Sequence, residues 1–266
     1  MRSSEAMVAP VIAAERAFAE RHKQVPLKQA FQEYAAADGV AVRPAGVRNV
    51  QEDLAGWPNV NNTGNVAWWP MLAGVAQSGD LGFTTGPATY PGGNFGGYFT
   101  IWKKQADGSW KWLIDQGTGQ NKILVSSKPG DAPAIVPVST VGPMDPALAW
   151  RDLLAADTAL GAATAVNSSA LLGKIAPEAW LTGFSRHPSV GLAAARAEMS
   201  LRPAKIAMKP KGGGVSTAGD FGWTYGYASW VDDGGAPKRG SYLRAWQRRP
   251  SGWVIVADNL SMFARG

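Results

Sequence analysis

The sequence predicts an α+β fold built from two tandem copies of one module. A motif that runs from Ser78 to Gly86 is written again from Ala218 to Gly226, 140 residues further on. In each copy a Gly-Asp turn precedes large side chains at alternate positions, which is the period of a strand with one packed face. Helical sequence precedes the motif in both halves. Helices followed by antiparallel strands are therefore expected twice.

Two more strands of each half repeat. The segment 98–105 matches 242–249, and 110–115 matches 253–258. The offsets are 144 and 143 residues, so the differences in length fall in loops, where insertions are tolerated. The repeat predicts that the closing aspartates, Asp115 and Asp258, occupy equivalent places.

The length of 266 residues allows two domains of ordinary size. A Pro-rich, extended run separates the two halves. We expect a first domain over 1–128, a linker over 129–144 and a second domain over 145–266.

In the first half, Ala, Glu, Arg and Gln with spaced apolar residues predict helix over 6–37, broken in two at Pro26. Runs of β-forming residues between turn residues indicate the elements that follow. These are a strand over 40–42, a short helix over 47–57, a strand over 66–76 and a flexible hairpin loop over 92–97.

In the second half, leucines at helical spacing predict a helix over 147–165. The elements expected after it are a helix beginning at Asn167, a strand over 177–181, a short helix over 189–201 and a turn at 211–214.

Composition excludes several classes of function. The net charge of +6 comes from scattered basic residues and not from one run, so nucleic acid is not an expected partner. Cys is absent, which removes disulfides, thiolate metal sites and Cys nucleophiles. With His22 and His187 as the only histidines, a His-rich metal site cannot form, and we expect neither a metal nor a cofactor.

No stretch approaches the roughly 20 apolar residues of a membrane span, and the first residues lack the apolar core of a signal peptide. We expect a soluble protein without a membrane span. Its compartment stays open between the cytoplasm and, with a leader removed, the periplasm or the exterior.

The order of elements, the Gly-Asp-Leu-Gly-Phe-Thr-Thr-Gly strand at 79–86 and the Trp-Lys strand after the turn at 107–109 resemble the NTF2-like superfamily, and within it the SnoaL-like, DUF4440-type proteins. The resemblance covers 13–115 and, with gaps, 147–258. It implies two cone-shaped modules, in which a curved antiparallel or mixed sheet wraps around helices and leaves an apolar pocket at the wide end. It further implies that the modules pair through their sheets as a pseudo-dimer, so that the chain is a monomer.

The resemblance also offers two catalytic patterns. The ketosteroid-isomerase-like members carry a carboxylate base just before a Pro-Gly turn, but here Arg43 precedes Pro44 and that base is missing. The water-activating Asp/Arg/Asp set of the limonene-epoxide-hydrolase-like members has candidates in Asp38, Arg43, Asp115 and Asp258. Spacing alone does not place them around one water.

The repeated aspartates Asp115 and Asp258 are the first candidates for acid–base chemistry. His187, in the turn expected at the lip of the second pocket, is the third, whereas His22 is expected to end a helix. The 12 Trp residues indicate either a packed core or an aromatic-lined pocket. The candidate ligand-binding residues are Tyr98, Trp102, Trp112, Trp57, Trp180, Tyr225 and Trp246.

Three functions remain open: a module that binds a small apolar or aromatic molecule, a lyase, isomerase or hydrolase that acts on such a molecule through Asp and His, and a scaffold whose pockets are filled. Binding ranks first, and whether the protein is an enzyme stays open. The first half keeps more of the motif, so the site is expected there, lined by Tyr98, Trp102 and Trp112 with Asp115 as its polar anchor. Strand alternation opposes the pairing of Trp112 with Asp115, which are an odd number of positions apart, unless a bulge re-aims one of them.

Overall fold

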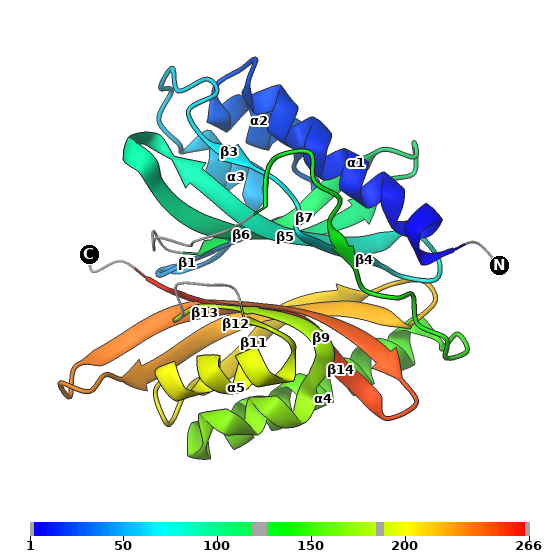
Figure 1. Ribbon diagram of the computed structural model, residues 1–266, viewed down its shortest axis with the longest axis vertical. Coiled ribbons are helices and arrows are strands. Elements are labelled where there is room, and N and C mark those ends of the chain that lie inside the picture. The colour runs from blue at the N-terminus through cyan, green and yellow to red at the C-terminus, as the bar shows by residue number, and fades with distance from the viewer. Residues whose placement is uncertain (1–2, 119–126, 185–188, 264–266) are drawn as a thin grey trace. The chain divides into compact units, whose positions relative to one another are not determined.

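The computed structural model describes residues 3–118, 127–184 and 189–263, and the chain forms two compact units. The first unit is Met1–Val75 with Gly79–Val138, and the second is Ala76–Ser78 with Ser139–Gly266. Each unit carries helices on one face of its own curved sheet (Figure 1). The predicted α+β class with two modules is therefore confirmed. None of the described helices is long and apolar enough to cross a membrane.

The first unit places its helices before a long antiparallel sheet, in the predicted order. Its elements are α1 (Ser4–His22), α2 (Leu27–Tyr34), β1 (Val40–Arg43), β2 (Gly46–Asn49), α3 (Val50–Ala55), β3 (Ala67–Trp68), β4 (Leu72–Val75), β5 (Leu81–Tyr90), η1 (Pro91–Gly93), β6 (Asn94–Lys104), β7 (Trp110–Thr118) and β8 (Ala134–Ile135). The strand order is β7-β6-β5-β4-β8, with β3 also paired to β5. β8 runs parallel to β4, and the other neighbours are antiparallel.

The ends of the first two helices follow from the sequence. The Ser3 hydroxyl caps α1 by accepting a hydrogen bond from the Ala6 N–H at 3.2 Å. His22 closes α1, and Pro26 precedes α2 at a position where its missing N–H costs nothing. The predicted break at Pro26 is confirmed.

Several predicted elements of the first half and of the linker differ in the structure. The hairpin loop expected over 92–97 is strand from Asn94 onward. The strand expected over 66–76 splits into β3 and β4 around Pro70, which has no N–H for the ladder. The helix expected over 47–57 begins only at Val50, because Gly46–Asn49 pairs with β1 and the Asn49 side chain then caps α3. Within the run expected as a linker, Ala134–Ile135 forms β8.

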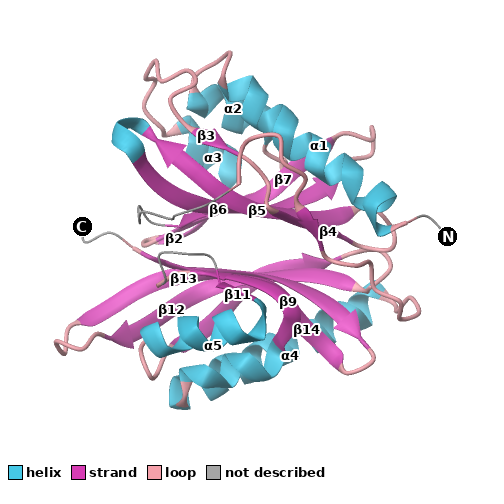
Figure 2. Ribbon diagram, in the orientation of Figure 1, coloured by secondary structure: helices cyan, strands magenta, loops and turns pink. Residues whose placement is uncertain are grey.

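The second unit repeats the arrangement of helices on one face of a sheet (Figure 2). Its elements are α4 (Pro146–Val166), η2 (Ser168–Lys174), β9 (Ile175–Thr182), β10 (Ser189–Val190), α5 (Gly191–Leu201), β11 (Ala207–Val215), β12 (Phe221–Val231), β13 (Pro237–Arg249) and β14 (Gly252–Met262). The strand order is β10-β9-β14-β13-β12-β11, in which β14 and β9 are parallel.

The turn predicted at 211–214 is wrong. These residues belong to β11, which pairs with β12. The register shifts between Pro210 and Gly212, where proline has no N–H to donate to the ladder. The glycine-rich sequence of a bulged strand therefore resembles that of a turn.

The strands of the two sheets pair at equivalent positions. Trp102 on β6 and Trp246 on β13 each lie beside a register shift in the pairing with the last strand. The shift leaves one extra residue in that strand, Leu113 in the first unit and Val256 in the second. Because the two bulges lie at the same rung, the internal repeat predicted from the sequence is confirmed.

The closing aspartates also coincide, as predicted. Asp115 pairs with Thr100 on β6, and Asp258 pairs with Arg244 on β13. Both of these partners lie two positions before the tryptophan beside the bulge. Equivalent residues of the two units can therefore be named from register alone.

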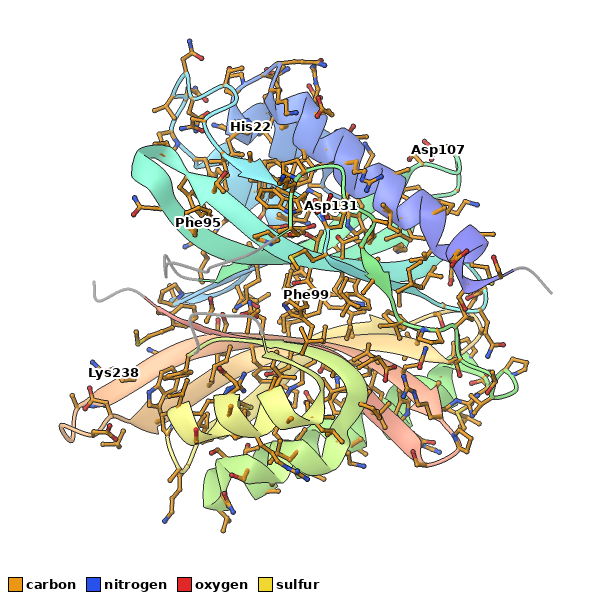
Figure 3. The ribbon with its side chains drawn as sticks, in the orientation of Figure 1. His22, Phe95, Phe99, Asp107, Asp131 and Lys238 are labelled. Carbon is orange, nitrogen blue, oxygen red and sulfur yellow. The ribbon has the colours of Figure 1, made fainter. Side chains whose placement is uncertain are left out.

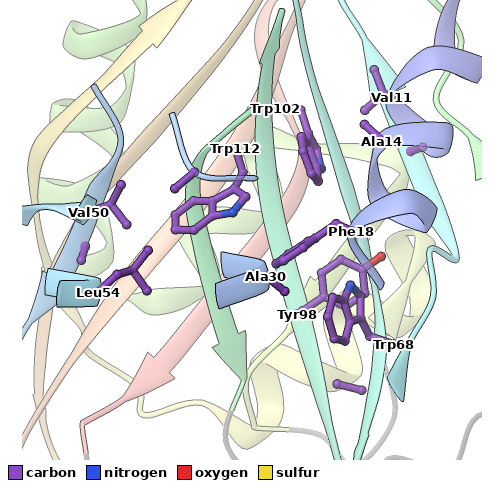
Figure 4. Close-up of a cluster of buried hydrophobic side chains, with 14 of the residues drawn as sticks. Val11, Ala14, Phe18, Ala30, Val50, Leu54, Trp68, Tyr98, Trp102 and Trp112 are labelled. Carbon is purple, nitrogen blue, oxygen red and sulfur yellow. The ribbon is translucent and has the colours of Figure 1, made fainter. Parts of the chain in front are cut away.

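In the first unit α1 packs against the inner face of the sheet, which we define as the face toward the helices (Figure 4). Phe18 lies at the centre of this contact. Its ring stacks on Tyr34 at 5.1 Å and meets Trp68 edge-on at 4.9 Å. Tyr98 and Trp102 reach the same core from β6.

Candidate functional site

A bulge in β7 turns Trp112 and Asp115 toward the helices of the first unit. Trp112 pairs with Trp102 and Asp115 pairs with Thr100, with Leu113 as the extra residue between these rungs. Paired residues project from the same face of a sheet, and Trp102 and Thr100 are two positions apart, so all four pairing side chains share the inner face. The Thr100 hydroxyl donates to Asp115 Oδ2 at 2.6 Å. The objection from strand alternation is thereby removed.

Glu15 brings a second carboxyl group to this face from α1. It is fully buried, and its oxygens accept hydrogen bonds from Trp68 Nε1 at 2.6 Å, from Trp102 Nε1 at 3.0 Å and from the Thr84 hydroxyl. In the described part of the first unit, the ion pairs of Lys and Arg involve neither Glu15 nor Asp115. The two carboxyl groups are therefore held by neutral donors.

The environment raises the pKa of both carboxyl groups. Burial raises the pKa of Glu15 to about 7, against the hydrogen bond from Thr84, while nearby Asp115 raises it further. Burial raises the pKa of Asp115 to about 6, against the hydrogen bond from Thr100. Asp115 is partly exposed and Glu15 is not, so a solute reaches Asp115 first. The two groups form a coupled pair that titrates in the range suited to proton transfer near neutral pH.

Tyr98 lies on the same inner face, two positions before Thr100. It is 5% exposed, and its hydroxyl has no hydrogen-bond partner among the described residues. Burial raises the pKa of Tyr98 well above its ordinary value, and Glu15 and Asp115 raise it further, against an interaction with the nearby Thr84 hydroxyl that is too long or too poorly aligned to count as a hydrogen bond. A protonated, buried phenol therefore lies beside the carboxyl pair with unused hydrogen-bonding capacity.

Beyond Tyr98 and Asp115 the inner face of the sheet carries small residues on three strands, and Trp68 pairs with one of them, Ala88. The positions that share this face by alternation and register are Gly86 and Ala88 on β5, Gly96 on β6 and Gly117 on β7. We call these four residues the glycine floor. Gly86, Ala88 and Gly96 are buried, and a Cβ at Gly86 would lie 2.1 Å from the Trp69 carbonyl oxygen, so this part of the floor is covered. Gly117 is exposed, and among the described residues a Cβ built there meets nothing closer than a backbone oxygen at 3.9 Å. Open space therefore lies over the floor at Gly117.

The predicted aromatic residues of the first half form a row from the core outward. Trp102 is fully buried and donates to Glu15. The ring of Trp112 meets that of Phe31 edge-on, with the ring centroids 5.7 Å apart, and the ring centroids of Phe31 and Trp57 are 5.4 Å apart. Phe31 and Trp57 are partly exposed, so the row ends at the surface.

A guanidinium group fills the equivalent place in the second unit. Arg244 takes the rung of Thr100 and is fully buried; its Nε donates to Asp258 Oδ1 at 2.9 Å, and its Nη1 donates to Asp157 Oδ1. The Tyr242 hydroxyl donates to Asp157 Oδ2 at 2.7 Å, and its ring centroid lies 4.4 Å from the guanidinium carbon. The second unit therefore neutralises its own carboxylates.

Arg202 adds a second buried cation. Its Nη2 donates to Asp258 Oδ2 at 2.9 Å, and its Nε donates to Glu198 Oε1 at 3.0 Å. Burial alone would raise the pKa of Asp258, but Arg202 and Arg244 outweigh it and hold this pKa below its ordinary value. Asp258 is therefore ionised at neutral pH.

The second unit also fills the wide end of its inner face. Leu260 takes the rung of Gly117, and Trp230 takes that of Tyr90. Leu260 and Trp230 belong to one buried apolar cluster, and Phe184 packs edge-on against Trp230 at 5.9 Å. Gly226, Ala228 and Gly240 take the rungs of Gly86, Ala88 and Gly96, so within the glycine floor the two units differ only at Gly117.

The other predicted residues of the second half do not gather around Asp258. Trp246 is buried on the inner face, where its Nε1 donates to Thr224 Oγ1 at 2.8 Å. Tyr225 and Trp180 project from the opposite face, because their strand positions alternate with those of inner-facing residues. His187 lies outside the described residues.

The candidates for the Asp/Arg/Asp set are not brought together. Asp38 pairs with Lys103 at 2.6 Å near the surface, and Arg43 pairs with Asp53. His22 ends α1, as predicted, and is buried there (Figure 3). In the described part of the chain, no group of three or more His, Asp or Glu side chains is arranged to hold a metal ion.

Sequence reasoning misses the two helix carboxyls, Glu15 and Asp157. They are 142 residues apart, and each follows a buried apolar residue, Val11 or Leu153, by four positions. Each interrupts the apolar face of its helix at the same place. A charge at a core-facing position, repeated in both halves, is the signal that could have identified them.

No family model matches the sequence, and no curated protein is similar to it at the sequence level. Among solved structures, a protein of unknown function of the DUF3225 family from Pectobacterium atrosepticum is 20% identical over 44% of this chain and 93% of its own, with a TM-score of 0.35. A ketosteroid isomerase-like protein from Erwinia carotovora atroseptica is 17% identical over 43% of this chain and 95% of its own, with a TM-score of 0.37. A Mycobacterium tuberculosis protein solved in complex with estradiol-17beta-hemisuccinate is 15% identical over 41% of this chain and 91% of its own, with a TM-score of 0.34.

Proposed function

We propose that the inner face of the first unit binds a small aromatic molecule through one polar end. The observation that carries the proposal is the exposed Gly117 beside the partly exposed Asp115, at the place where the second unit puts Leu260. Small-molecule sites combine apolar walls with a few placed polar groups. The space at Gly117 gives room for a flat ring, and Asp115 with Tyr98 supplies the polar groups.

The variant Gly117→Leu tests this proposal, because it copies Leu260 into the first unit. We expect the wild-type protein to bind members of a set of naphthols, aromatic ketones and aromatic amines, measured by isothermal titration calorimetry. Gly117→Leu should fold, as judged by circular dichroism, and lose this binding. Gly173→Leu is the matched control, since Gly173 is exposed in the second unit and has no atom within 4 Å of its Cβ position. Equal binding by both variants would move the site elsewhere.

A second candidate function is acid–base catalysis on the bound molecule, as in an isomerase, lyase or hydrolase. The observation that favours it is the pair Glu15 and Asp115, with pKa values of about 7 and about 6. A general acid or base works best when its pKa lies near the working pH. Asp115 would exchange the proton with the ligand, and its negative charge would raise the pKa of Glu15.

Asp115→Asn separates the two functions, because the amide keeps the shape of the carboxyl group but cannot transfer its proton. For an enzyme, turnover of a bound compound falls by about 100-fold or more while its affinity changes little. The rate of the wild-type enzyme should also depend on pH, with midpoints near the two pKa values. A binding protein shows no turnover of any bound compound in either form.

A further inference from the structure

The second unit shows what kind of group fits between the carboxyl groups of the helix and of the last strand. Three groups surround the Arg244 guanidinium there: the carboxylates of Asp157 and Asp258, and the ring of Tyr242. The first unit carries the same three groups at the equivalent places, namely Glu15, Asp115 and Tyr98. It lacks the cation, because Thr100 at the rung of Arg244 reaches only Asp115.

The carboxyl pair of the first unit has no cation of its own within the described residues. The ion pairs found there join other residues, such as Arg21 with Glu33 and Lys103 with Asp38. Carboxyl groups that are buried or partly buried without a counter-ion are costly to ionise, which raises the pKa values of Glu15 and Asp115. A cation that enters the site regains the attraction that Arg244 provides in the second unit.

Tyr98 is an independent sign of a missing partner. Tyr242 uses both of its parts in the second unit: the hydroxyl donates to Asp157, and the ring faces the guanidinium. The Tyr98 hydroxyl is buried and makes no hydrogen bond of ordinary geometry to a described residue; its polar neighbour Thr84 already donates to Glu15 and accepts from Trp102. Tyr98 can therefore offer an incoming cation its hydroxyl oxygen as an acceptor and its ring face.

We propose that the polar end of the ligand is a planar cation with N–H donors, an amidinium or a guanidinium, held by Asp115 and Glu15 beside Tyr98. This inference rests on the proposed function and specifies the chemistry of its ligand. Bidentate pairing of planar N–H donors with carboxylates is strong and directional. The aromatic part of such a ligand then lies over Gly117.

The structure also sets the direction of approach. In the second unit Met208 contacts the Arg244 guanidinium, whereas in the first unit Trp68, at the same rung, donates to Glu15 at 2.6 Å. In the first unit, Trp68 therefore occupies the side of the site that corresponds to the position of Met208 in the second unit. The cation enters from the side of Asp115, which is partly exposed.

Three isosteric compounds test the proposal on the full chain: benzamidine, benzamide and benzoate. At pH 8 we expect benzamidine to bind at least about tenfold more tightly than benzamide, because charge-assisted hydrogen bonds are about twice as strong as neutral ones. Benzoate should bind most weakly. Lowering the pH to 5 should weaken benzamidine binding by about tenfold, because the carboxyl pair gains protons. Asp115 and Glu15 face the cation, and Tyr98, Tyr90 and Arg16 are the other titratable groups that act on the site.

Two variants sharpen the test. Thr100→Arg supplies the cation from within the chain, as in the second unit, and should abolish benzamidine binding, whereas Thr63→Arg adds the same charge at an exposed position of the first unit and should not. If Thr100→Arg does not fold, Asp115→Asn replaces it and should weaken benzamidine binding more than benzamide binding.

The outcomes separate this inference from the proposed function. If benzamide binds as tightly as benzamidine, the proposal of a cationic ligand is wrong and the proposed aromatic site stands. The same conclusion follows if the naphthols bind and none of the three isosteres does. If no compound of either set binds, both proposals fail.

Discussion

Thr100 and Arg244 occupy the same rung of the two repeated sheets. Each pairs with a threonine of the preceding strand and with the closing aspartate of the next strand. One side chain is short and neutral, and the other is long and charged. The second unit thereby pairs its buried carboxylates with a cation from its own chain, whereas the first leaves Glu15 and Asp115 with raised pKa values of about 7 and about 6.

Removal of the guanidinium should therefore destabilise the second unit. We expect Arg244→Met to lower the free energy of unfolding by about 3–5 kcal/mol, because it leaves Asp157 and Asp258 buried without their shared partner. Urea unfolding followed by circular dichroism measures the loss. Arg249→Met is the control: Arg249 forms a partly exposed pair with Glu178, and its loss should cost no more than about 1 kcal/mol. Similar losses in both variants would refute the structural role of the network.

The stability of the first unit should depend on the protonation of Glu15. Its pKa of about 7 in the folded state exceeds the ordinary value of 4.5, so the folded state holds more protons between these pH values. The free energy of unfolding therefore falls as the pH rises through this window, by about 3 kcal/mol at 1.36 kcal/mol per pKa unit. In Glu15→Gln this contribution should disappear, while the fall that Asp115 causes between pH 3.8 and about 6 should remain. Relative to the wild type, the variant should gain stability between pH 4.5 and 7 and change no further above it; a difference that is independent of pH would contradict the assignment.

A glycine on β12 should not tolerate a methyl group. A Cβ at Gly226 would lie 2.1 Å from the Lys209 carbonyl oxygen on β11. We expect Gly226→Ala to cost about 1–3 kcal/mol through overpacking. Gly173→Ala has open space around it and should change stability by less than about 1 kcal/mol. Thermal unfolding of the two variants checks the prediction, which fails if their midpoints agree.

The oligomeric state stays a prediction from the sequence. The superfamily that the sequence resembles pairs single modules through their sheets, and this chain carries both modules. We expect a monomer, so light scattering should give a mass near the 28.0 kDa of one chain. A mass near twice that value would contradict it.

Much of the fold could be predicted because its signals are local. Helical spacing predicted the two helices around Pro26, and the repeated Gly-Asp strand predicted two modules. The bulge at Leu113 could not be predicted, because no residue type there marks the extra position. Alternation alone therefore separated Trp112 from Asp115, which share a face in the structure.

The candidate site was predicted only in part for a related reason. Alternation places Arg244 on the face of Tyr242 and Trp246, so its burial could be inferred from sequence. Its partner Asp157 lies 87 residues away on a helix, and no local pattern links the two. An ion pair between a helix residue and a sheet residue can be identified only when the positions of both elements are known.

The bulges at Leu113 and Val256 also order events in the ancestry of the chain. A bulge is a specific feature that persists in related sheets, so one at the same rung in both units dates from before the duplication. The helix and strand carboxyls are shared in the same way. The ancestral single module thus already carried a buried acidic pair. Thr100 and Arg244 differ, so at least one of them arose after the duplication, and the two units now treat the same carboxyl pair differently.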